Sequence, residues 1–212
     1  MRPLPRLHAI TDSAIVKRED FGIRAAAIAS AGPAVALHAR DRSASAEELT
    51  NLTRRLLAHA GPPESSVFVN GRPDIARGLS AQGVELGSDD LSAADARLVL
   101  GQGAPIWVGR SVHSMEEARA AKEEGADFLM LGHVYETPSH AGQAPKGLAL
   151  LTQVVALGLP VIAIGGITAS RVAEVKAAGA WGVAAIRALW DAPDSAVAAL
   201  ALLAPWIAGE PA

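Results

Sequence analysis

Eight short apolar runs alternate with longer amphipathic or alanine-rich segments along the whole chain. Strands this apolar cannot face water on either side, and they are typical of parallel sheets covered by helices. Eight strand–helix units favour a closed (β/α)8 TIM barrel, with an open doubly wound sheet as the alternative. No linker divides the sequence, so we expect one α/β domain over residues 1–212, with a core at about residues 7–207.

The apolar runs predict strands at Leu7–Ile10, Ala34–Ala39, Ser66–Asn70, Gly83–Gly87, Pro105–Gly109, Phe128–Gly132, Val161–Gly165 and Gly182–Ile186. The segments between them predict helices at Lys17–Ala31, Ala46–Ala60, Pro73–Gln82, Ala93–Leu100, Met115–Glu124, Gly147–Leu157, Ala169–Ala178 and Asp194–Trp206. Ser92 and Ser114 precede two of these segments at the position of a helix cap.

Composition excludes several functions. The chain has no cysteine, so disulfides and thiolate chemistry are excluded. Its formal net charge is −3, and no basic run suggests nucleic-acid binding. No apolar stretch is long enough to span a bilayer, and the first residues lack the apolar core of a signal peptide. We therefore expect a cytoplasmic protein that binds neither nucleic acid nor membrane.

The strongest local motif is the apolar run Pro160–Ile164, which ends in Gly165 and Gly166, with Thr168 as the expected cap of the next helix. Glycines let backbone N–H groups approach a ligand oxygen closely, and the loops after the last two strands of a barrel often bind phosphate. Ile186 and Arg187 end the eighth strand and would lie opposite. The alternative is that both glycines serve only a tight turn.

His133 ends the sixth strand, and Thr137 follows it in the longest irregular stretch, Tyr135–Lys146. An imidazole titrates near neutrality, so His133 at the mouth of a barrel could serve as an acid and a base. A lone histidine is also often only a structural hydrogen-bonding residue.

Three further groups follow strands. Ser111 and His113 could donate hydrogen bonds to a substrate carboxylate, although Ser114 could equally cap the next helix and leave His113 on the surface. Arg40 and its neighbour Arg42 could clamp an anion or form surface ion pairs. Asn70 could bind the ligand or only form a turn.

Two more features concern metals and buried histidines. The run Ser88–Asp90 could hold a metal, but at a helix start it is better interpreted as helix capping. No spacing resembles a dedicated metal cage, so we predict neither a metal nor a cofactor. His8 lies within the first strand, where its side chain could face the barrel interior.

These residues, in this order, resemble the thiamine-phosphate-synthase superfamily and, within it, the TenI-type thiazole tautomerases. The likeness runs from Leu7–Asp12 to the Gly182 strand, and its most specific segments are Val69–Ala76, Gly109–Ser114, Gly132–Thr137 and Ala163–Gly166. The resemblance implies a (β/α)8 barrel that binds a carboxylated thiazole phosphate and catalyses a 1,3-proton shift on it.

Motif differences within that superfamily indicate the tautomerase branch. The synthase usually has proline where this chain has His133, a magnesium-binding aspartate where it has Gly71, and a lysine where it has Ser139-His140. Without that carboxylate and lysine, departure of a diphosphate should fail. Against the tautomerase stand the unusual loop 138–146 and Arg187 in place of a small residue.

The resemblance therefore predicts an isomerase with His133 as the catalytic base. The substrate-binding residues that it implies are Arg40, Asn70, Ser111, His113, Thr137, Gly165, Gly166, Ile186 and Arg187. The alternatives are a magnesium-dependent thiamine phosphate synthase, a non-catalytic phosphate-ligand-binding regulator, and a sugar-phosphate or indole-type isomerase. The expected partner is a small phosphorylated thiazole. Trp190 and Trp206 leave a homodimer open.

Overall fold

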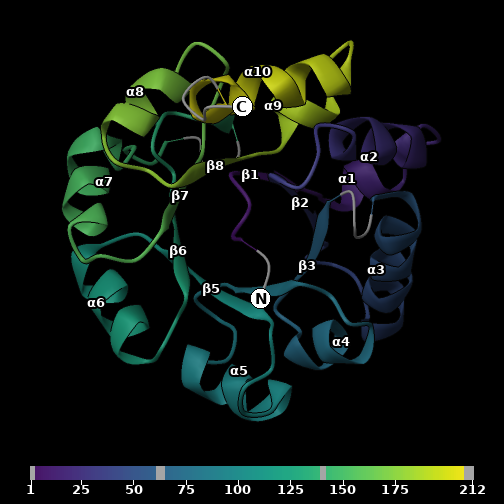
Figure 1. The fold of residues 1–212 in the computed structure, drawn as a ribbon, viewed down its shortest axis with the longest axis horizontal. Coiled ribbons are helices and arrows are strands. Elements are labelled where there is room, and N and C mark those ends of the chain that lie inside the picture. The colour runs from purple at the N-terminus through teal and green to yellow at the C-terminus, as the bar shows by residue number, and fades with distance from the viewer. Residues whose placement is uncertain (1–2, 61–64, 139–141, 208–212) are drawn as a thin grey trace.

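The computed structural model describes residues 3–60, 65–138 and 142–207. Its eight strands form one closed parallel barrel in chain order, with β8 paired to β1 (Figure 1). This confirms the expected (β/α)8 barrel. The strands are β1 (Leu7–Ile10), β2 (Val35–Ala39), β3 (Ser66–Asn70), β4 (Gly83–Leu86), β5 (Trp107–Val112), β6 (Phe128–Leu131), β7 (Val161–Ile164) and β8 (Gly182–Ala185).

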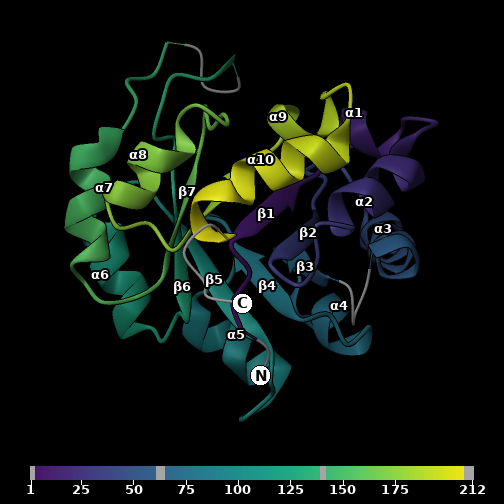
Figure 2. The same ribbon diagram turned by 45° about the horizontal axis from the view of Figure 1, so that its top comes forward.

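Helices surround the barrel on its outer side, as Figures 1 and 2 show. They are α1 (Ser13–Val16), α2 (Phe21–Ala29), α3 (Ala46–Ala60), α4 (Pro73–Gly78), α5 (Ala93–Leu100), α6 (Met115–Glu123), α7 (Gly147–Val155), α8 (Val172–Ala177), α9 (Arg187–Trp190) and α10 (Ser195–Ile207). Two of them, the single-turn helices α1 and α9, are not predicted from the sequence.

Local capping explains where the first helices differ from expectation. Asp12 accepts hydrogen bonds from the N–H groups of Ala14 and Ile15, which starts α1 before the expected Lys17. The chain then turns, and α2 begins only at Phe21.

The start of α8 and the end of β5 also differ from the sequence prediction. Thr168 does not cap α8, because its hydroxyl contacts Ser170 and α8 begins at Val172. The fifth strand continues past Gly109 to Val112, which pairs with Leu131 of β6.

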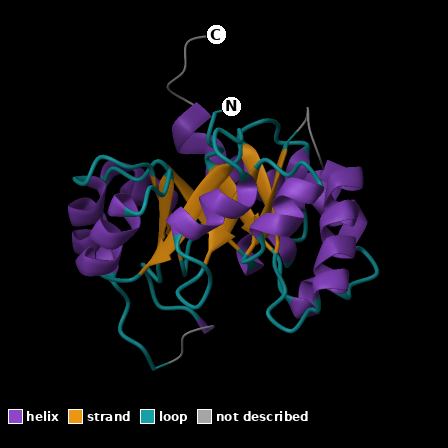
Figure 3. Cartoon of the chain, turned by 90° about the horizontal axis from the view of Figure 1, so that it is seen from below, coloured by secondary structure: helices purple, strands orange, loops and turns teal. Residues whose placement is uncertain are grey.

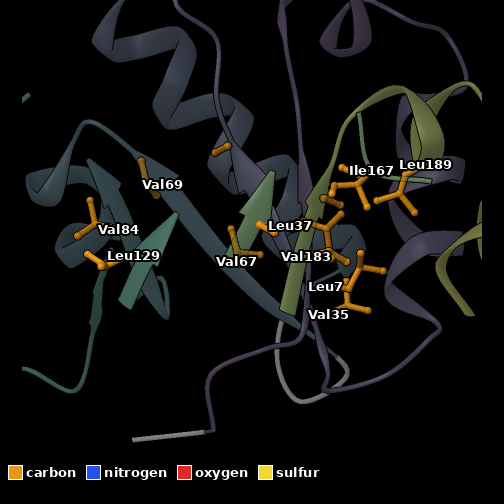
Figure 4. Packing of buried hydrophobic residues seen from close by; sticks show 14 of the residues in the cluster. Leu7, Val35, Leu37, Val67, Val69, Val84, Leu129, Ile167, Val183 and Leu189 are labelled. Atoms are coloured by element: carbon orange, nitrogen blue, oxygen red, sulfur yellow. The ribbon is translucent and has the colours of Figure 1, made fainter. Parts of the chain in front are cut away.

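Apolar side chains pack on both sides of the strands. On the outer side, Leu37, Val67 and Val183 belong to the core between barrel and helices (Figure 4). Inside the barrel, a second cluster includes Phe68 and Phe128, which face positions that carry only glycine. Outward-facing and inward-facing residues alternate along each strand, because successive side chains of a β-strand point to opposite faces of the sheet.

The two ends of the barrel differ. The described segment that leads into β1 lies near one end, and the loop after β6 extends beyond the other (Figure 3). At the first end Leu4 packs into the barrel interior, and its carbonyl accepts a hydrogen bond from the Trp181 indole. The carboxyl ends of the strands therefore form the open end, where barrel enzymes build their sites. No helix in the described ranges is long and apolar enough to cross a membrane.

Candidate active site

Polar side chains point into the barrel where the strands end, and we call this end the mouth. One such residue comes from each of β2 to β5, and together they are His38, Asn70, Glu85 and Ser111. The loops after β6, β7 and β8 form the opposite side of the mouth.

Gly165 and Gly166 follow β7 with φ angles of +96° and +66°, a region that favours glycine. A Cβ on Gly165 would lie 2.3 Å from Cβ of His133, and one on Gly166 would lie 2.6 Å from the Glu136 carbonyl oxygen. The Tyr135 N–H also donates to the Gly165 carbonyl at 3.1 Å. The two glycines are therefore required by close packing against the segment after β6, and they leave a surface of bare backbone at the mouth.

The end of β8 lies beside this glycine turn. Strands β7 and β8 pair Ile164 with Ala184, so Ile186 lies next to the turn. Ile186 also occupies the N-cap position of the short helix α9. Arg187 is exposed and donates to the Asp12 carboxylate at 2.6 Å. The charge of Arg187 is therefore paired with that of Asp12, which lies in the loop after β1.

His133 is buried, with 4% of its surface exposed. Its Nε2 lies 3.3 Å from the Gln143 carbonyl oxygen, and its own carbonyl accepts from the Lys146 N–H. The loop after β6 therefore folds back over the imidazole. Thr137 and Gln143 line an open hollow of about 710 Å³ in this loop. Ser139 and His140 lie outside the described residues.

Arg40 follows β2 and is half-buried at the mouth. Burial, together with the neighbouring Arg42 charge, lowers its pKa below the ordinary value. Among the described residues no carboxylate forms an ion pair with Arg40. A partly desolvated guanidinium of this kind is suited to bind an anion.

Ser111 donates to Oε1 of Glu85 at 2.9 Å, within the barrel. Burial raises the pKa of Glu85 to about 8, so this carboxyl group is mostly protonated at neutral pH. Within the described part of the chain, Oε2 of Glu85 has no hydrogen-bond partner. His113, by contrast, contacts the exposed Glu117 through Nδ1 at 3.0 Å, beside the Ser114 cap of α6.

His8 and His38 are fully buried and lie in line with Asn70. His8 Nδ1 lies 2.8 Å from His38 Nε2, and His38 Nδ1 lies 3.0 Å from Oδ1 of Asn70. Burial lowers the pKa of His8 to about 4 and that of His38 well below its ordinary value. Both rings are therefore neutral near pH 7.

Asp90 lies against Gly71 at the rim of the mouth. A Cβ on Gly71 would be 2.9 Å from Oδ1 of Asp90, while Oδ2 accepts from the Gly87 N–H at 2.7 Å. Helix α5 is capped by Ser92 instead, so the interpretation of Ser88–Asp90 as a helix cap is wrong.

Sequence reasoning missed two residues here. Glu85 gave a signal, since it is the one charged residue in the strand Gly83–Leu86, whose other members are apolar or glycine. Asp90 lies in a run that the sequence analysis considered as a metal site and then interpreted as a helix cap, because only the fold brings it to Gly71.

The fold and the mouth define a (β/α)8 barrel of the kind on which enzymes build their sites, with a partly desolvated guanidinium and a bare glycine turn at its mouth. The family model described as thiamine monophosphate synthase matches residues 7–189, and the chain belongs to this family.

Named relatives and a solved structure agree with this assignment. The chain is 43% identical to the thiamine-phosphate synthase of Anaeromyxobacter dehalogenans over 183 residues, covering 85% of this chain and 81% of the relative. It is 40% identical to that of Thermus thermophilus over 178 residues, covering 83% and 84%. The thiamine phosphate pyrophosphorylase of Pyrococcus furiosus has the same fold, with a TM-score of 0.78, 29% identity and 94% of each chain covered.

These relatives correct the sequence-based prediction of an isomerase. They are named as synthases, which are transferases, so the assignment as a thiazole tautomerase with an isomerase activity is wrong. That prediction gave three local substitutions more weight than similarity along the whole chain. It also treated the magnesium-binding carboxylate as missing, because Gly71 stands where the synthases usually have an aspartate. In the fold, Asp90 brings a carboxylate next to Gly71.

Proposed function

We propose that this chain is a thiamine phosphate synthase, a transferase that joins a pyrimidine diphosphate to a thiazole phosphate. The ring nitrogen of the thiazole forms a bond to the pyrimidine methylene carbon as that carbon's bond to the diphosphate oxygen breaks. The products are thiamine phosphate and diphosphate. The observation that carries this proposal is identity of about 40% to named synthases over more than four fifths of the chain.

The mouth offers separate places for the two phosphorylated groups. The turn Gly165–Gly166 and the neighbouring Ile186 provide bare backbone for the phosphate of the thiazole. Arg40 lies on the other side, where its guanidinium, which has no ion pair within the described part of the chain, can bind the diphosphate. Ser111 and Asn70 lie between these two places and line the space for the rings.

Magnesium is the cofactor that this family implies. Magnesium typically keeps several waters and binds one or two carboxylates together with substrate phosphates. Asp90 fits this requirement, because it presents a carboxylate at the rim of the mouth, with Oδ1 2.9 Å from where a Cβ on Gly71 would lie. Arg110 donates to the Gly87 and Leu91 carbonyls and holds the loop that carries Asp90. Bound there, the ion would neutralise charge on the departing diphosphate.

His133 takes a structural role in this proposal. Its buried ring contacts the Gln143 carbonyl, and its carbonyl accepts from Lys146, so it holds the end of the loop after β6 against the start of that loop. Thr137, in the same loop, faces the hollow beside it.

The proposal is tested by incubating the purified chain with both substrates, with magnesium or with a chelator, and measuring thiamine phosphate by chromatography. The Thermus thermophilus relative serves as the positive control. We expect product only when magnesium is present. If the control forms product and this chain forms none, the proposal fails. Calorimetric binding of thiazole phosphate without turnover would then identify a binding protein.

A further inference from the structure

A line of three hydrogen bonds, two of them buried and the last partly buried, crosses the barrel interior from its closed end to the mouth. It starts at the Pro5 carbonyl oxygen, which lies 3.2 Å from Nε2 of His8. It continues from Nδ1 of His8 to Nε2 of His38 at 2.8 Å, and from Nδ1 of His38 to the Asn70 carboxamide, whose Oδ1 lies 3.0 Å away. Both histidines have 0% of their surface exposed, so bulk water does not reach either imidazole.

The surroundings keep both rings uncharged. Phe68 packs against both imidazoles, with ring centroids 5.4 Å from His8 and 5.1 Å from His38, and Phe128 lies 5.7 Å from His8. The nearest cation acting on His38 is Arg40, whose charge also disfavours protonation. Each ring therefore has one N–H donor and one nitrogen acceptor.

The Pro5 carbonyl fixes the direction of every bond in the line. A carbonyl can only accept, so His8 must carry its proton on Nε2 and accept through Nδ1. His38 must then donate from Nε2 and accept through Nδ1. Asn70 must therefore donate its amide N–H to His38. The opposite direction would place the lone pair of His8 against the Pro5 oxygen, leaving both buried atoms without a hydrogen bond.

We infer that the His8–His38 pair turns the Asn70 carboxamide so that its nitrogen faces the barrel interior and its oxygen faces the mouth. In the structure Oδ1 of Asn70 faces His38, so the inferred orientation is reached by a half-turn of the carboxamide. The half-turn exchanges oxygen and nitrogen within the same space, so nothing else in the mouth need move. Asn70 ends β3 and is only half-buried, so the outer atom is within reach of a ligand.

This orientation makes Asn70 an acceptor for a hydrogen-bond donor on the substrate. Resting on the proposed function, the matching group is the ring amino group of the aminopyrimidine, and a phosphate oxygen is the wrong partner. His8 and His38 are positioning residues, because they act on the substrate only through Asn70.

The tautomers can be measured in the free protein, independently of activity. Two-bond proton–nitrogen correlation spectra of the ¹⁵N-labelled protein near pH 7 distinguish the two neutral tautomers and the imidazolium. The signals are assigned by their loss in His8→Gln and His38→Gln. We expect both rings to be neutral with the proton on Nε2. A proton on Nδ1 of His38, or an imidazolium at either ring, would overturn the inference.

Binding measurements test the consequence for the ligand. In His38→Gln, the new amide can accept from Asn70 and donate to His8, whereas in His38→Leu it can do neither. We expect His38→Leu to weaken aminopyrimidine binding by about tenfold, and His38→Gln to stay within about threefold of the parent chain. Thiazole phosphate binding, held at Gly165 and Gly166, should be unchanged in both. Equal losses in the two variants would contradict a positioning role.

Discussion

At the scale of single residues, Glu85 is a buried carboxyl group inside the barrel with only the Ser111 hydroxyl as a partner among the described residues. Desolvation keeps it protonated, which makes it a donor at the mouth instead of an anion. The sequence shows a glutamate in an apolar strand, but its protonation depends on neighbours from β5 and β6.

Glu85 predicts how stability changes with pH. The unfolded chain ionises this group near its ordinary pKa of 4.5, whereas the folded chain keeps the proton until about 8. Its contribution is therefore fully present below about pH 4.5 and is lost as the pH rises through 8. In Glu85→Gln, which keeps the Ser111 bond, the free energy of unfolding should fall less between these pH values, by on the order of 1–4 kcal/mol. Denaturant unfolding at several pH values measures this. If Glu85→Gln and the exposed control Glu47→Gln gave the same pH dependence, the raised pKa would be wrong.

Asp90 predicts the magnesium dependence of the reaction. Asp90→Asn keeps an acceptor for the Gly87 N–H but removes the negative charge beside Gly71. We expect product formation to fall about tenfold or more, and the magnesium concentration for half-maximal rate to rise. Asp89→Asn removes a charge from the same exposed loop and should change neither quantity. Equal effects of the two substitutions would show that only the charge of the loop matters.

At the scale of elements, the turn after β7 and the segment after β6 form one packed unit. The sequence predicts the double glycine and its position, but it does not show that Gly165 lies against His133. The element ends that sequence analysis missed have the same cause. Asp12 starts α1, and pairing with Leu131 prolongs β5 to Val112, and both depend on contacts that form only in the fold.

A comparison of two glycines separates backbone strain from crowding. Gly165 and Gly32 have similar φ angles, +96° and +93°, but a Cβ on Gly165 would meet His133 at 2.3 Å and one on Gly32 would meet nothing within 4 Å. Gly32→Ala should cost only the strain, about 1 kcal/mol. Gly165→Ala should cost more and should abolish thiazole phosphate binding in calorimetry. If the two variants lost equal stability and both still bound the ligand, the packed turn would not be the phosphate site.

At the scale of the whole molecule, the barrel is predictable because its topology follows from the repeated apolar runs. The polar groups of the mouth are harder to predict, since each contact joins different strands. His8 and His38 are 30 residues apart in the chain, and Glu85 and Ser111 are 26 apart. The sequence identified several residues at the mouth, but assigning their chemistry from motif differences alone led to the wrong reaction.

Packing inside the barrel predicts that Gly83 does not tolerate a larger side chain without loss of stability. A Cβ on Gly83 of β4 would lie 2.3 Å from the ring of Phe68, while one on Gly78 of α4 would meet nothing within 4 Å. Gly83→Ala should therefore destabilise the barrel by about 1–3 kcal/mol through overpacking. Gly78→Ala, in a helix, should be neutral or slightly stabilising. Chemical denaturation of both variants checks this, and an unchanged midpoint for Gly83→Ala would refute the packing argument.

The central claim, that this mouth joins two phosphorylated substrates, is tested most directly by ³¹P NMR of one reaction mixture. With both substrates and magnesium, we expect the thiazole phosphate signal to be replaced by that of thiamine phosphate, while free diphosphate appears in equal amount. The same mixture with Gly165→Ala should show neither change. Diphosphate released without consumption of thiazole phosphate, or no change at all with the parent chain, would contradict the claim.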